Sequence, residues 1–191
     1  MTASVVSPPH LVRHAAFASR LLERPRDLVV YLPPGYDDEP RRRYPVLYMH
    51  DGQNLFEGDT AYVPGQYWRL GEMADMLTAE GRIEPLVIVG VYNTGHGRLH
   101  EYTPTRDRRL GGGLARTYGR MLVEELKPFI DARYRTDSAR ERTGLGGASL
   151  GGLVTMFLGL RHADVFGRMA VMSPSVWWDR RAILRYVAKA S

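Results

Sequence analysis

A glycine-x-serine-x-glycine pentapeptide, Gly147-Ala148-Ser149-Leu150-Gly151, is the segment of this sequence whose residue types could do covalent chemistry. A strand-like stretch precedes it and an apolar, helix-like stretch follows, which is the context of a nucleophile elbow. There the serine sits on a strained backbone, and the glycines let strand and helix approach closely. The pattern predicts Ser149 as the nucleophile of an acyl transfer. A glycine-rich turn that only packs tightly is the alternative.

Acyl transfer also needs hydrogen-bond donors for the oxyanion that forms on the substrate carbonyl. One donor is expected at the backbone N–H of Leu150, where the start of a helix also favours negative charge. The second should come from the loop after the third strand, residues 50–54, and the Gln53 N–H is the candidate. In the same loop, His50 and Asp51 are expected to contact substrate. Asp51 could also form an Asx-type turn.

Strand-like and helix-like segments alternate along the chain, which favours an α/β fold with a mostly parallel sheet flanked by helices. The first two strands should form an antiparallel pair at the sheet edge. Strands are expected at residues 11–17, 27–32, 45–49, 85–92, 142–147 and 168–172. Helices are expected at 68–77, 114–134 with a kink or break at Pro128, 150–160 and 180–188. The polar stretch 93–113 is too long for a simple connection and predicts a binding loop.

Composition narrows the class of protein. The 191 residues suffice for one domain, 1–191, with a hydrophobic core. Cysteine is absent, which excludes disulfides and thiolate ligands, and neither a metal nor another cofactor is expected. No run approaches the roughly 18 apolar residues of a membrane span, and residues 1–17 lack a signal-peptide pattern, so a cytoplasmic protein without membrane contact is expected. The net charge of +5 rests on dispersed arginines. The run at 41–43 indicates solvated surface, so nucleic acid is not an expected partner.

Several stretches together resemble the putative-esterase family and cover most of the chain in the right order. They are VYLPPGY at 30–36, YPVLYMHDGQNLF at 44–56, RLHEYTP at 98–104, ERTGLGGASLGGL at 141–153 and VFGRMAVMSPSVWW at 165–178. That family includes enterochelin, feruloyl and acetylxylan esterases, S-formylglutathione hydrolases and mycolyl transferases, and the enterochelin-esterase-like branch is the most similar. The resemblance implies an α/β-hydrolase fold and an ester substrate, and it also assigns an oxyanion donor to Gln53. It places Trp177 and Trp178 beside the acyl pocket, as substrate contacts, with core packing as an even alternative. The polar loop carrying Arg98 and Glu101 is expected at the rim of the pocket, with Arg98 in contact with substrate.

A serine nucleophile needs a base, and the base needs an orienting carboxylate. The one histidine after the serine is His162, roughly 20 Å along the following helix, which indicates a surface or capping residue. In the resembling family the acid and the histidine lie beyond the strand that here ends near Met172. Three explanations stay open. The chain is a fragment without its last strands, which is favoured because the elbow and oxyanion motifs are intact; another chain completes the triad; or the protein is an inactive binding scaffold. A missing C-terminal segment or another chain would then cover the sheet edge.

The sequence therefore predicts a serine ester hydrolase that acts on a small-molecule carboxylic ester through an acyl-enzyme. An acyltransferase of the mycolyl-transferase type would use the same intermediate and is the alternative enzyme, and the binding scaffold is the non-enzymatic one.

Overall fold

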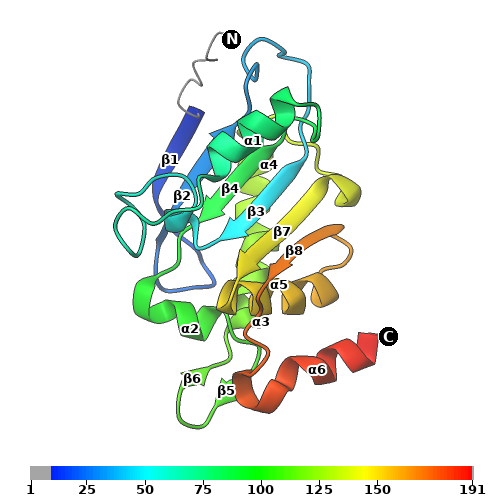
Figure 1. The fold of residues 1–191 in the computed structure, drawn as a ribbon. Coiled ribbons are helices and arrows are strands. Elements are labelled where there is room, and N and C mark those ends of the chain that lie inside the picture. Colours follow the sequence, from blue (N-terminus) through cyan, green and yellow to red (C-terminus); the bar gives the residue numbers. More distant parts are fainter. Residues whose placement is uncertain (1–9, 191) are drawn as a thin grey trace.

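A computed structural model describes residues 10–190 as a six-stranded sheet with helices on both faces (Figure 1). The strand order is β1-β2-β4-β3-β7-β8. The strands are β1 (His10–Phe17), β2 (Arg26–Leu32), β3 (Val46–His50), β4 (Val87–Val91), β7 (Thr143–Ala148) and β8 (Arg168–Met172). Strands β4, β3, β7 and β8 run parallel, whereas β1 and β2 form an antiparallel pair at one edge. The predicted α/β-hydrolase fold with its mostly parallel sheet is confirmed.

The central strands are buried on both faces because helices cover both. All five residues of β4 are buried, as its unbroken apolar sequence predicts. A smaller apolar cluster packs under α1 (Leu70–Ala79), and a larger one packs under α3 (Ala115–Met121) and α5 (Leu150–Arg161). The sheet is therefore a rigid support for the loops at the carboxyl ends of its strands.

The helical segment before β7 continues through Pro128 without a break. Residues Leu122–Leu126 form a π-helical stretch between α3 and α4 (Lys127–Asp131). Because proline cannot donate the i→i−4 hydrogen bond, a locally wider helix directly before it is one way to keep the chain helical. The predicted break at Pro128 is therefore wrong, and the irregularity near it is a π-helical segment.

The polar segment at 93–113 is more structured than a plain loop. It contains a 3-10 turn (Gly95–Gly97), the short helix α2 (Arg98–Glu101) and a small hairpin of β5 (Arg106–Asp107) and β6 (Gly111–Gly112). Figure 1 shows α2 and this hairpin beyond the arrowheads of β3, β4 and β7. The segment therefore lies at the carboxyl ends of the parallel strands, where folds of this kind bind their ligands.

The chain after β8 forms α6 (Trp178–Ala190), whose first turn is irregular. Asp179, Arg180 and Arg181 all have positive φ, between 42° and 61°. Strand β8 is the second edge of the described sheet, and its Met169 is 50% exposed. Whether another segment covers this edge remains a prediction.

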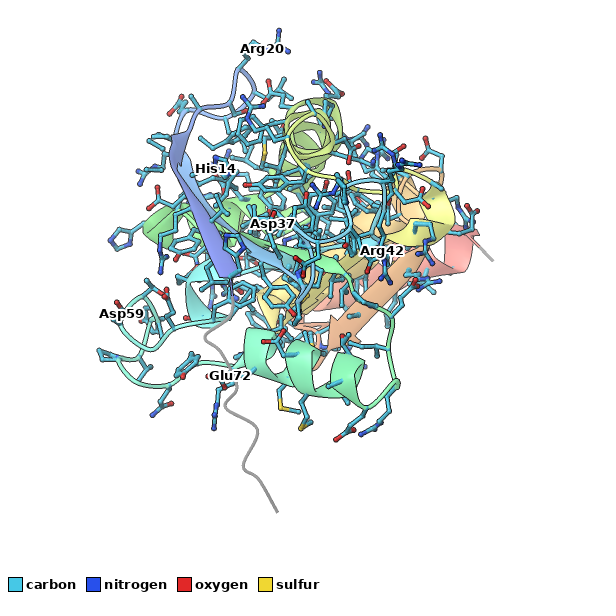
Figure 2. The ribbon with its side chains drawn as sticks, turned by 90° about the horizontal axis from the view of Figure 1, so that it is seen from above. His14, Arg20, Asp37, Arg42, Asp59 and Glu72 are labelled. Atoms are coloured by element: carbon cyan, nitrogen blue, oxygen red, sulfur yellow. The ribbon has the colours of Figure 1, made fainter. Side chains whose placement is uncertain are left out.

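The arginine run at 41–43 lies on the surface, as its sequence context predicts. In the run at 41–43, Arg41 and Arg43 are exposed, and Arg42, labelled in Figure 2, pairs with Glu39 at 2.8 Å. Among residues 10–190, no helix is long and apolar enough to cross a membrane. The signal-peptide prediction falls mostly on residues 1–9, outside the described part of the chain.

Candidate active site

Ser149 stands at the junction of β7 and α5 in the strained conformation that its glycine spacing predicts. Its φ is 57° and its ψ is −119°, which is uncommon for a residue with a side chain. Backbone hydrogen bonds hold it there: its N–H donates to Met172 O at 3.1 Å, and its carbonyl accepts from Ser175 N at 3.0 Å. A strain of about 1–3 kcal/mol persists only where the surroundings enforce it. The elbow geometry is confirmed.

The flanking glycines are required because backbone atoms lie where side chains would be. A Cβ on Gly147 would lie 2.9 Å from the carbonyl carbon of Gly151, across the strand–helix junction. A Cβ on Gly152 would lie 2.7 Å from Met172 O, in the neighbouring strand. The first turn of α5 therefore sits directly against β7 and β8, and this contact fixes where Ser149 points.

The hydroxyl of Ser149 belongs to an exposed residue and meets a second serine. Its Oγ lies 3.1 Å from Ser175 Oγ. Within residues 10–190, no histidine forms a hydrogen bond with this hydroxyl. His162 is the C-cap of α5, as predicted, and burial lowers its pKa.

The predicted oxyanion loop follows β3 as a 3-10 turn, Gly52–Asn54, and polar contacts hold it in place. The carboxylate of Asp51 accepts hydrogen bonds from Arg98 Nε at 2.7 Å, Arg98 Nη2 at 2.8 Å and Asn93 Nδ2 at 2.7 Å. The N–H of Asp51 donates to the Tyr102 hydroxyl at 3.2 Å. The carboxylate thus binds side chains of the 93–102 segment, and the alternative of a local Asx-type turn is wrong.

His50 is buried, which corrects the expectation that it contacts substrate. Only 2% of its surface is exposed, and its Nδ1 lies 3.0 Å from the Tyr118 hydroxyl. Burial lowers the pKa of the imidazole to about 4, so it is neutral at physiological pH. The ring lies beneath the elbow, where its Cδ2 is 3.0 Å from the position of a Cβ on Gly147. Its place is therefore in the support of the site.

An open cleft of about 800 Å³ lies against the oxyanion loop. Its lining residues are Asp51, Gln53, Asn54, Tyr62, Asn93, Gly95, His96, Arg98, Leu99 and Leu150. Both predicted oxyanion residues therefore face one cleft, with Arg98 at its side. The loop at 57–67, which carries Asp59 (Figure 2), supplies Tyr62, 85% exposed. Sequence reasoning missed Tyr62 because no motif contains it.

The tryptophan pair and Glu101 do not line this cleft. Trp178 is 1% exposed and its Nε1–H donates to Thr105 O at 3.1 Å, so it belongs to the core, the alternative left open for it. Trp177 is 60% exposed. Glu101 is 4% exposed and forms a bidentate ion pair with Arg26, at 2.9 and 3.0 Å. The rim position expected for Glu101 is wrong, because this residue is buried. Its carboxylate instead links β2 to the 93–113 segment through Arg26.

Residues 19–190 match the protein family described as "Putative esterase". The chain belongs to this family. It is 29% identical over 166 residues to the endo-1,4-beta-xylanase/feruloyl esterase of Xylanibacter ruminicola, covering 85% of this chain and 21% of that protein. It is 29% identical over 168 residues to the ferri-bacillibactin esterase BesA of Bacillus subtilis, covering 76% of this chain and 53% of that one.

A solved structure supports the same relationship. The IroE-like serine hydrolase from Shewanella oneidensis superposes with a TM-score of 0.76 at 26% identity, over 95% of this chain and 55% of that one. The chain thus spans about half the length of this hydrolase and of the Bacillus esterase. The resemblance inferred from the motifs is confirmed.

Proposed function

We propose that this protein is a serine ester hydrolase with Ser149 as its nucleophile. The Oγ attacks the ester carbonyl carbon while a general base takes the hydroxyl proton, and the backbone N–H groups of Gln53 and Leu150 hold the oxyanion. The alcohol leaves with a proton. Water then cleaves the acyl–Ser149 ester, which releases the acid and restores the hydroxyl.

The observation that carries this proposal is the backbone of Ser149. Ser149 has a φ of 57°, a helix follows it directly, and backbone hydrogen bonds hold it to two neighbouring segments. If the turn served packing alone, a glycine would adopt this conformation without strain. The strain is explained if the side chain must be presented above the sheet edge. Gln53 and Leu150 lining the same cleft supports the oxyanion assignment.

The substrate class follows from the family and from the cleft. Relatives named as a feruloyl esterase and a ferri-bacillibactin esterase make ferulate esters and siderophore esters the first candidates. The cleft of about 800 Å³ is of a size that accepts such molecules, and it combines an aromatic side chain, Tyr62, with the guanidinium of Arg98. These groups would contact the ring and an anionic oxygen of the substrate.

The test is steady-state hydrolysis of p-nitrophenyl butyrate and of a feruloyl ester by the complete natural protein, because no histidine among residues 10–190 bonds to the Ser149 hydroxyl. Ser149→Ala should lower kcat by about 10⁴-fold or more, because the nucleophile is lost. The matched control is Ser138→Ala, at an exposed serine elsewhere. A fluorophosphonate should label Ser149 alone, as located by mass spectrometry. Hydrolysis that survives in Ser149→Ala would overturn the proposal, and a new ester formed from an added alcohol would indicate acyl transfer instead.

A further inference from the structure

Ser175 is a buried serine that meets the proposed nucleophile from a different part of the chain. It lies in the loop between β8 and α6, 26 residues after Ser149, and the two Oγ atoms are 3.1 Å apart. Its position is set by the backbone, because its N–H donates to Ser149 O at 3.0 Å and its carbonyl accepts from Trp178 N at 3.2 Å. The loop is therefore anchored at the elbow independently of the Ser175 side chain.

The direction of the hydroxyl–hydroxyl bond follows from burial. Ser175 is 5% exposed, and in the described part of the chain Ser149 Oγ is the partner of its hydroxyl. A buried hydroxyl hydrogen needs an acceptor. Ser149 is exposed, so its own hydrogen can go to water or to a base. This difference in burial favours Ser175 as the donor and Ser149 Oγ as the acceptor.

We propose that Ser175 is a positioning residue for the nucleophile: its hydroxyl orients Ser149 Oγ and stabilises the negative charge that this atom gains as its proton leaves. The inference rests on the function proposed above for Ser149. A hydrogen bond to a charged oxygen is roughly twice as strong as one to a neutral oxygen, so the bond strengthens as deprotonation proceeds. Ser175 keeps its own proton throughout, and the Ser149 proton goes to the base.

This role can be separated from a structural one. Ser175→Ala removes the hydroxyl but leaves the backbone bonds to Ser149 and Trp178 in place. Ser175→Cys keeps a side chain of similar size with a much weaker donor. Ser173→Ala is the matched control, since Ser173 is an exposed serine two residues away in the same loop.

The experiment uses the complete natural protein and measures kcat, KM and the rate of fluorophosphonate labelling of Ser149, with thermal unfolding as the check on folding. Ser175→Ala should lower kcat and the labelling rate roughly tenfold, with KM within twofold, because the lost hydrogen bond acts on the oxygen that becomes charged in the transition state. Ser175→Cys should lie in between, and Ser173→Ala should match the wild type.

Folded Ser175→Ala and Ser175→Cys variants that keep the wild-type kcat and labelling rate would overturn the inference while leaving Ser149 as nucleophile. A wild-type protein that is not labelled at Ser149 at all would overturn the proposed function, and this inference with it. If Ser175→Ala does not fold, the Cys variant decides by the same comparison.

Discussion

The close approach of Gly52 to β4 lets the oxyanion assignment be tested by adding one methyl group. A Cβ on Gly52 would lie 2.5 Å from Gly90 C, 2.7 Å from Val91 N and 2.8 Å from Gly90 O. All three are backbone atoms of a central strand paired on both sides, so they cannot yield. Ordinary contact begins near 3.4 Å, and the loop must therefore retreat by roughly 0.9 Å, or 3.4 minus 2.5.

That displacement falls on the residue directly before Gln53, whose N–H is the proposed oxyanion donor. A misplacement of about 1 Å in catalytic geometry can cost on the order of 10²-fold in rate. We therefore expect Gly52→Ala to lower kcat about 100-fold with a smaller change in KM. Overpacking should also lower the free energy of unfolding by about 1–3 kcal/mol.

The assay is p-nitrophenyl butyrate hydrolysis combined with urea unfolding. The matched control is Gly81→Ala, at the end of α1, where nothing lies within 4 Å of the added Cβ but φ is +67°. This control should lower the free energy of unfolding by about 1 kcal/mol through backbone strain, which is close to the loss expected for Gly52→Ala, and it should leave kcat unchanged. If Gly52→Ala is folded and keeps kcat within threefold of the wild type, residues 52–53 do not carry the oxyanion donor.

Two further predictions concern buried ionisable residues. Because the pKa of His50 is lowered to about 4, the unfolded chain binds a proton between pH 6.5 and 4 that the folded chain does not, so the free energy of unfolding should fall by on the order of 3 kcal/mol as the pH falls through this range. In thermal unfolding, His50→Gln should flatten this pH dependence, whereas the control His96→Gln, at an exposed histidine, should not. Glu101→Gln should lower the free energy of unfolding in urea by about 3–5 kcal/mol, because Arg26 is 3% exposed and keeps its charge without a partner. The double variant Arg26→Met/Glu101→Leu should recover most of that loss. A Glu101→Gln variant as stable as the wild type would contradict the reasoning.

Local sequence patterns determined the elements and the elbow. The unbroken apolar run of β4 encodes a strand that is buried on both faces. The alternation of strand-like and helix-like segments along the chain indicates the mostly parallel sheet. The strained backbone of Ser149 was predictable for the same reason, since the glycines that permit it lie two residues away on either side. Short-range steric rules act within a few residues and can therefore be seen in the sequence.

The tertiary structure decided which side chains face the cleft. The roles of Trp178, Glu101 and His50 depend on partners 68 to 75 residues away in the chain: Thr105 O, Arg26 and the Tyr118 hydroxyl. No periodicity or spacing encodes such pairs, because burial and hydrogen bonding depend on how separate segments pack. The contact between the hydroxyls of Ser149 and Ser175 is of the same kind, since β7 and β8 must pair before the loop after β8 can bring the second serine to the first.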